Sequence, residues 1–173
     1  ILDYCREKQL QVEYIINTHG HPDHVCGNGR LQQATGAKIV MHADDVAYFG
    51  DPRVKGYFSG LGLPESPPVD VIVRDGDIIR FGEEQFEVIH TPGHTPGGIC
   101  LYSPPHCFTG DTVFVGAVGR TDFPGGSMEQ MIGAIKSRLL TLPPDTIVWP
   151  GHGYGGLQST IGREERTNPY FDL

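Results

Sequence analysis

Imidazole and carboxylate side chains are concentrated in residues 18–24, which read Thr-His-Gly-His-Pro-Asp-His. His19, His21, Asp23 and His24 are of the types that bind zinc and iron. In an extended segment alternate side chains share a face, so His19 and His21 can project together, whereas Asp23 and His24 lie in the turn that follows. This spacing favours two neighbouring metal ions. The alternative is a histidine-rich surface loop that binds no metal.

The elements around these residues predict how the loop is held. Residues 12–17 form a short segment that is rich in β-branched residues and mostly apolar, which is typical of a buried strand. Pro22 cannot continue a central strand, so the chain must leave the sheet there. Residues 25–35 predict a helix that ends at Gly36, and residues 37–41 predict a second strand parallel to the first. Strand, helix and strand in this order indicate an α/β layer with a right-handed crossover.

The remaining pattern predicts further elements. A short N-terminal helix, a helix over 43–49 and a Gly- and Pro-rich surface loop over 50–70 are expected. Strands and hairpins follow, with a turn at Gly82 and another between 99–103 and 106–109. Ser127 with Gln130 predicts a capped helix. Its apolar stripe faces the core and consists of Met128, Met131, Ile132, Ile135 and Leu139. A last strand over 146–149 and a helix over 159–166 complete the expected fold.

The His-x-His-x-Asp-His pattern after a strand resembles the signature of the metallo-β-lactamase superfamily, and the resemblance covers nearly the whole chain. It implies an α/β fold, an αββα metallo-β-lactamase-type sandwich, as a single domain over residues 1–173. Members of this superfamily usually place several strands before the first helix seen here. Because this sequence opens on Ile1 inside a helical pattern, the resemblance implies that N-terminal strands are missing from the chain.

The resemblance also implies the remaining metal ligands. His94 falls in a Thr-Pro-Gly-His-Thr segment that is similar to the family's third-ligand motif, and Asp111 follows a strand as the family's bridging aspartate does. His152 resembles the final ligand. One metal is then held by His19, His21 and His94, the other by Asp23, His24 and His152, and Asp111 bridges both. His90 is interpreted as a structural histidine.

Residues 119–124, Gly-Arg-Thr-Asp-Phe-Pro, resemble the short glyoxalase II-like hydrolases and also the persulfide dioxygenases. Arg120 falls where glyoxalase II has a cationic residue that contacts glutathione, and an arginine fork suits a carboxylate. Tyr154 matches a glutathione-contacting tyrosine. The chain departs from the pattern at Asp122, which replaces another such tyrosine, and at Gly98, where many glyoxalase II proteins have a second histidine.

The resemblance implies a metal-dependent thioester hydrolase, acting on a substrate such as S-lactoylglutathione through a metal-bridging hydroxide. Two divalent ions lower the pKa of water towards neutrality, and Asp23 and Asp111 are the catalytic carboxylates. Zinc is favoured, with iron or manganese as alternatives. A second hypothesis is a persulfide dioxygenase with one iron held by His19, His94 or His21, and Asp111. A third is a non-catalytic, oligomer-forming remnant.

Composition narrows the function further. The chain has 173 residues, 38% of them hydrophobic and 20% charged, which is typical of a soluble globular protein. The net charge of −8 argues against a nucleic-acid partner, and no apolar run suits a membrane span. Cys100 and Cys107 are expected to be diagonal across a hairpin, about 7 Å apart, which is too far for a disulfide. Free thiols indicate a reducing compartment, so a cytoplasmic protein is expected. The sequence leaves the oligomeric state open.

Overall fold

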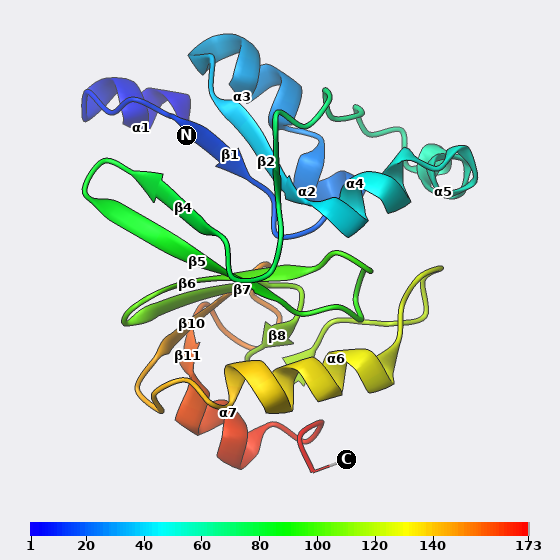
Figure 1. The fold of residues 1–173 in the computed structure, drawn as a ribbon, viewed down its shortest axis with the longest axis vertical. Helices are drawn as coiled ribbons and strands as arrows, with labels where there is room; N and C mark the ends of the chain where they lie inside the picture. Colours follow the sequence, from blue (N-terminus) through cyan, green and yellow to red (C-terminus); the bar gives the residue numbers. More distant parts are fainter. Residues whose placement is uncertain (173) are drawn as a thin grey trace. The chain divides into compact units, whose positions relative to one another are not determined.

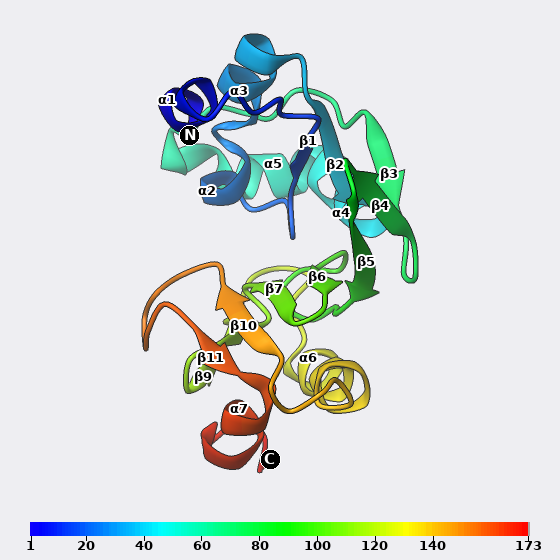
Figure 2. The ribbon, with the colours of Figure 1, turned by 90° about the vertical axis from the view of Figure 1, so that its left-hand side faces the viewer.

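The computed structural model describes residues 1–172 and is a mixed α/β structure (Figures 1 and 2). Contacts divide it into two compact units, the first over residues 1–73 and the second from Arg74 onwards. Each unit has a sheet of its own. Within the described residues, no helix is both long and apolar enough to cross a membrane.

The first unit contains a three-stranded sheet in the order β1-β2-β3, formed by β1 (Tyr14–Ile16), β2 (Lys38–His42) and β3 (Val71–Val73). Both neighbouring pairs are parallel. Its helices are α1 (Leu2–Glu7), α2 (Pro22–Val25), α3 (Asn28–Thr35), α4 (Ala43–Gly50), α5 (Pro52–Phe58) and the 3₁₀ turn η1 (Ser59–Leu61). A small core between α3 and the sheet contains Ile15, Ala37 and Ile39, with Leu31 packed against them.

The predicted strand-helix-strand order of this unit is confirmed, and Gly36 ends α3 in the left-handed conformation with φ 72°. The single helix predicted over 25–35 is divided, because α2 already begins at Pro22 and α3 begins only after Gly27. The prediction of a loop over 50–70 was wrong in its first part. Asp51 caps α5 by accepting a hydrogen bond from the Arg53 backbone N at 2.8 Å.

The second unit contains a six-stranded sheet in the order β11-β10-β7-β6-β5-β4. Its strands are β4 (Ile78–Phe81), β5 (Glu84–His90), β6 (Ile99–Ser103), β7 (His106–Gly110), β10 (Ile147–Pro150) and β11 (Ser159–Thr160). A separate hairpin is formed by β8 (Val113–Phe114) and β9 (Ala117–Val118). The helices are α6 (Met128–Ala134), its wider continuation η2 (Ile135–Leu139) and α7 (Ile161–Thr167).

The helices of this unit cover one face of its sheet (Figure 1). Met131, Ile135 and Leu139 are fully buried there, which confirms the predicted stripe. Ser127 caps α6 as predicted, because its side chain accepts a hydrogen bond from the Gln130 backbone N at 3.3 Å. The predicted terminal helix begins two residues late, since residues 159–160 form β11 instead.

The β6–β7 hairpin is confirmed, and its register pairs Tyr102 with Cys107. Cys100 therefore lies diagonal to Cys107, and both are buried free thiols, as predicted. His106 is half-buried, because Trp149 Nε1 donates a hydrogen bond to its Nδ1 at 3.2 Å.

Glu164 of α7 is buried and holds the β8–β9 hairpin. Its carboxylate accepts hydrogen bonds from the Gly116 backbone N at 2.8 Å and from Asn168 Nδ2 at 2.9 Å, and it also contacts the Ser159 hydroxyl. A buried carboxylate requires such donors, because its desolvation is otherwise costly.

Candidate metal centre

The four predicted ligands of the first unit lie together after β1: His19 and His21 precede α2, and Asp23 and His24 are in its first turn. The ring centroid of His19 is 4.9 Å from that of His21 and 4.0 Å from that of His24. Nε2 of His24 is 3.7 Å from Oδ2 of Asp23. His19 and His21 are buried, whereas the Asp23 side chain is 54% exposed. The segment thus gathers three imidazoles and one carboxylate in a small volume.

Local packing explains why the chain takes this path. Pro22 is the first residue of α2, a position where its missing N–H costs nothing. Gly20 is pressed against Phe49, since a Cβ at position 20 would lie 2.3 Å from Cδ2 of that ring. The Gly20 backbone N donates a hydrogen bond of 2.8 Å to the buried carboxylate of Asp45. Two residues of α4, Phe49 and Asp45, therefore fix the backbone between His19 and His21.

Three residues that support this loop were missed in the sequence. Asp45 of α4 is one, and its only sequence signal is a second acidic residue at the start of a helix. Asn17 and Asn28 are the others. Both are buried, and each side chain donates its amide to the other, at 3.2 and 2.8 Å. This reciprocal pair joins the end of β1 to the start of α3, on either side of the ligand segment.

The three predicted ligands of the second unit also lie together. Oδ2 of Asp111 is 3.6 Å from Nε2 of His94 and 3.4 Å from Nε2 of His152. His94 and Asp111 are buried, and the His152 side chain is 31% exposed. One carboxylate oxygen thus lies within reach of two imidazole nitrogens, as a bridging ligand would.

Strand topology brings Asp111 and His152 together. β7 and β10 are parallel neighbours, so their carboxyl ends meet at the same edge of the sheet. Asp111 follows the end of β7, and His152 follows the end of β10. The Gly151 backbone N donates a hydrogen bond to Gly110 O at 2.7 Å, which fixes the two ends against each other.

The loop that carries His94 is anchored on both sides. Gly93 has a φ of 137°, and a Cβ there would lie 2.4 Å from Cβ of Met131 in α6. The hydroxyls of Thr91 and Thr112 are 2.9 Å apart and buried, so they link this loop to the one that carries Asp111. His90 contacts Pro96 O through Nε2 at 2.9 Å, a contact that fits its predicted structural role.

The hydrogen bonding of His94 fits metal binding. Its Nδ1 lies 2.7 Å from the backbone O of Arg120, which can only accept, so Nδ1 carries the proton. Nε2, which faces Asp111, then has a lone pair to offer a metal. A carbonyl partner of this kind orients ligating histidines and raises their basicity. Neutral imidazole with carboxylate is a donor set that zinc, iron and manganese accept.

The two predicted substrate contacts are both in the second unit. The Arg120 guanidinium binds the Asp122 carboxylate with two hydrogen bonds of 2.6 Å, and its Cζ lies 4.1 Å from the centroid of the Phe123 ring. The hydrogen bond from Arg120 lowers the pKa of Asp122 to about 2. Tyr154 is exposed and stacks on His152, with ring centroids 5.1 Å apart.

Comparison with known proteins identifies the family. The model of the metallo-β-lactamase superfamily matches residues 3–152, so the chain belongs to this superfamily. The predicted α/β fold class is thereby confirmed, and the chain is a metal-binding, hydrolase-like member. The family match runs through both compact units, whereas the single domain over 1–173 stays a prediction.

Two named relatives have different activities. Hydroxyacylglutathione hydrolase GloC of Haemophilus influenzae is 34% identical over 176 residues, covering 99% of this chain and 82% of that protein. The human mitochondrial persulfide dioxygenase ETHE1 is 33% identical over 171 residues, covering 97% of this chain and 60% of that protein. Among solved structures, TTHA1623 in a di-iron-bound form matches with a TM-score of 0.83 and 35% identity, covering 98% of this chain and 82% of that one.

Proposed function

We propose that this protein is a glyoxalase II-like hydrolase of acyl thioesters with two divalent metal ions. The seven ligands are those of the sequence motifs: His19, His21 and His94 for one ion, Asp23, His24 and His152 for the other, and Asp111 between them. The similarity to GloC supports the thioester substrate. We place the protein in the cytoplasm, which its four free thiols support.

One observation carries the two-metal proposal. Asp111 directs a single oxygen towards His94 and His152, which belong to different ligand groups. A carboxylate can hold two cations about 3.5–4 Å apart, and that arrangement is common in hydrolytic enzymes. When bound, the two ions supply hydroxide near neutral pH and polarise the acyl oxygen.

The chain's own residues account for the rest of the reaction. His94 is held with Nε2 available through its bond to the Arg120 carbonyl. Hydroxide adds to the acyl carbon, the carbon–sulfur bond breaks, and the thiolate leaves with the electron pair. Because a thiolate is a good leaving group, no separate general acid is needed. Arg120 and Tyr154 are proposed to contact the thiol part of the substrate, away from the bond that breaks.

Before a substrate binds, the Arg120 guanidinium is paired with the Asp122 carboxylate, so a substrate carboxylate has to replace Asp122. That ion pair is exposed, with side chains 60% and 67% accessible, so solvent screens it and a substrate can displace it at little cost. Arg120→Ala is therefore expected to raise KM with little change in kcat, because the contact is remote from the scissile bond.

A persulfide dioxygenase is the second candidate, favoured by the similarity to ETHE1. In that case one iron is held by His19, His94 or His21, and Asp111, and molecular oxygen is consumed. A thiol assay with S-lactoylglutathione and an oxygen electrode with glutathione persulfide, applied to one preparation, separate the two. We expect thiol release without oxygen uptake. Oxygen uptake at one iron per chain, without thioester turnover, would establish the dioxygenase instead.

Metal stoichiometry tests the ligand assignment directly. The purified protein is expected to hold two metals per chain by elemental analysis. His152→Ala or His24→Ala is expected to reduce this towards one, and Asp111→Ala to weaken both sites. Two metals retained by His152→Ala would contradict the assignment.

A further inference from the structure

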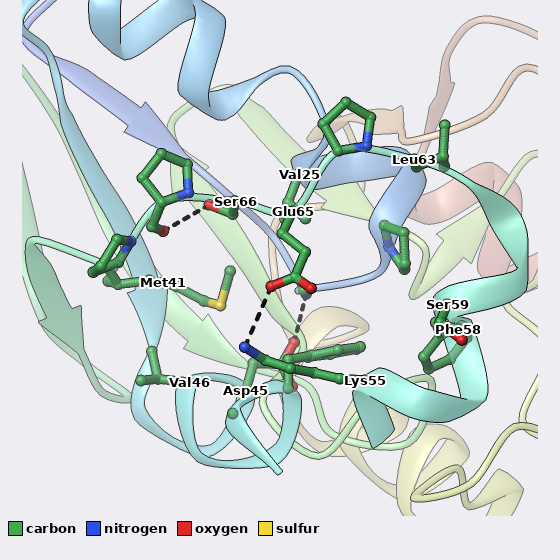
Figure 3. A pocket seen from close by; sticks show the side chains of 18 residues that line it. Val25, Met41, Asp45, Val46, Lys55, Phe58, Ser59, Leu63, Glu65 and Ser66 are labelled. Carbon is green, nitrogen blue, oxygen red and sulfur yellow. Dashed lines mark hydrogen bonds and ion pairs between the residues drawn. The ribbon is translucent and has the colours of Figure 1, made fainter. Parts of the chain in front are cut away.

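The first unit contains a cavity of about 540 Å³, and the segment that carries the four candidate ligands forms part of its wall through Gly20 and Pro22 (Figure 3). It lies among α2, α4, α5 and residues 63–69, and β2 contributes Met41. An apolar cavity of about 150 Å³ is already large enough to bind benzene. The volume found here is in the range of about 300–1,000 Å³ typical of small-molecule sites.

The wall of this cavity is mainly aliphatic and aromatic. Met41, Val46, Phe49, Phe58 and Leu63 line it, together with several prolines. Figure 3 shows Lys55 and Glu65 paired on one side, with Nζ and Oε2 3.4 Å apart and both side chains largely exposed. An occupant would therefore bury an apolar body in contact with these side chains.

Charge around the cavity disfavours an anion. Its lining includes the carboxylates of Asp45 and Glu65, against the single ammonium of Lys55. Asp45 is fully buried and accepts the Gly20 N–H, whereas Lys55 already pairs with Glu65. A carboxylate on the occupant would thus meet more negative than positive charge, in surroundings where burial makes that repulsion expensive.

The same walls hold the ligand His21. Phe49 and Phe58 line the cavity, and their ring centroids lie 5.5 and 5.3 Å from that of His21. Gly20 and Pro22, its two chain neighbours, line the cavity as well. A molecule that fills the cavity therefore touches residues that pack against this imidazole.

We propose that this cavity is a second binding site, for an uncharged aliphatic molecule, and that its occupancy is transmitted to His21 through Phe49 and Phe58. The site goes beyond the proposed hydrolase activity and does not depend on the identity of the thioester. Coupling between two binding sites is reciprocal. If an occupant of the cavity changes the affinity for the metal at His21, the metal changes the affinity for the occupant by the same factor.

Methionine methyl groups provide a direct test. The chain has three methionines, of which Met41 lines the cavity and Met128 and Met131 belong to α6 of the other unit. Octan-1-ol is titrated into zinc-loaded protein labelled with ¹³C at the methionine methyls. Its binding is expected to shift the Met41 signal and the His21 ring protons and to leave Met128 and Met131 unmoved. No shift of Met41 would overturn the proposal, and no shift of His21 would overturn the coupling.

Three variants sharpen this test. Val46→Phe fills the cavity from α4 and is expected to weaken octanol binding at least tenfold; Leu63→Phe, in the adjoining loop, serves the same purpose should the first variant unfold. Ile72→Phe is the matched control, because Ile72 is exposed on β3 and does not line the cavity. Octanoate is expected to bind several-fold more weakly than octanol. Equal binding to all variants, or tighter binding of octanoate, would contradict the assigned site and its charge preference.

Discussion

Gly119 gives the sharpest test of how the ligands of the second unit are positioned. A Cβ at this residue would lie 1.9 Å from the backbone O of Asp111 and 3.1 Å from Nδ1 of His94. Real Cβ atoms essentially never approach closer than 3.0 Å, so Gly119→Ala must part the two segments by about 1.1 Å. Neither neighbour can yield alone, because one is backbone and the other is held by the Arg120 carbonyl.

The size of the effect follows from that displacement. Overpacking of this kind costs about 1–3 kcal/mol of stability. Loss of an outer contact to a ligating histidine weakens metal binding by about 10–100-fold, and a misplacement of about 1 Å lowers the reaction rate by about 100-fold. Gly119→Ala is therefore expected to bind zinc at least about tenfold more weakly by chelator competition.

Gly133→Ala is the matched control for this prediction. Gly133 lies within α6, where a Cβ meets nothing within 4 Å. The substitution is expected to stabilise the metal-free protein by about 0.5–1 kcal/mol in urea denaturation, because glycine is unfavourable inside a helix. Its zinc affinity should remain that of the parent protein. If Gly119→Ala also keeps the parent's zinc affinity, then this glycine does not set the position of His94 and Asp111.

Further predictions address other residues. His94→Ala should lose metal in elemental analysis while His90→Ala retains it; the reverse pattern would overturn the assignment of these two histidines. Arg120→Ala should raise the pKa of Asp122 from about 2 towards the usual value near about 3.9, followed by the ¹³C shift of its carboxyl carbon. Because Asp122 has a lowered pKa when folded, this ion pair adds stability above the unfolded pKa and loses it as pH falls through the folded value; an unchanged titration in Arg120→Ala would refute the pairing. Glu164→Ala should destabilise the protein by about 3 kcal/mol in urea denaturation, because buried donors lose their acceptor. A loss below about 0.5 kcal/mol, the range of ordinary surface substitutions, would contradict that role.

The candidate ligands could be proposed from sequence because metal binding restricts residue type and spacing so strongly. His19, His21, Asp23 and His24 are adjacent in the chain, so a short window contains the whole pattern. His94, Asp111 and His152 are isolated in the sequence, and only resemblance to a family singled them out. The structure adds the reason that Asp111 and His152 meet, which is the parallel pairing of β7 with β10.

The supporting residues could not be predicted, because their roles depend on contacts distant in sequence. Asp45 accepts a hydrogen bond from Gly20, 25 residues earlier, and Asn17 pairs with Asn28. Helix α5 was missed for a different reason. The many glycines and prolines of residues 50–70 outweighed the local Asp51-Pro52 start signal, although both residues sit where a helix begins.

The uneven exposure of the ligands has a consequence for how the proposed centre exchanges metal with solution. His19, His21 and His94 are buried, whereas Asp23 and His152 have side chains 54% and 31% exposed. Water and small chelators therefore reach Asp23 and His152 before they reach the three buried histidines. Under a limiting metal supply the protein would persist as a half-loaded form, with the buried position filled and the exposed one in exchange with its surroundings. Activity would then report the availability of metal as well as that of substrate.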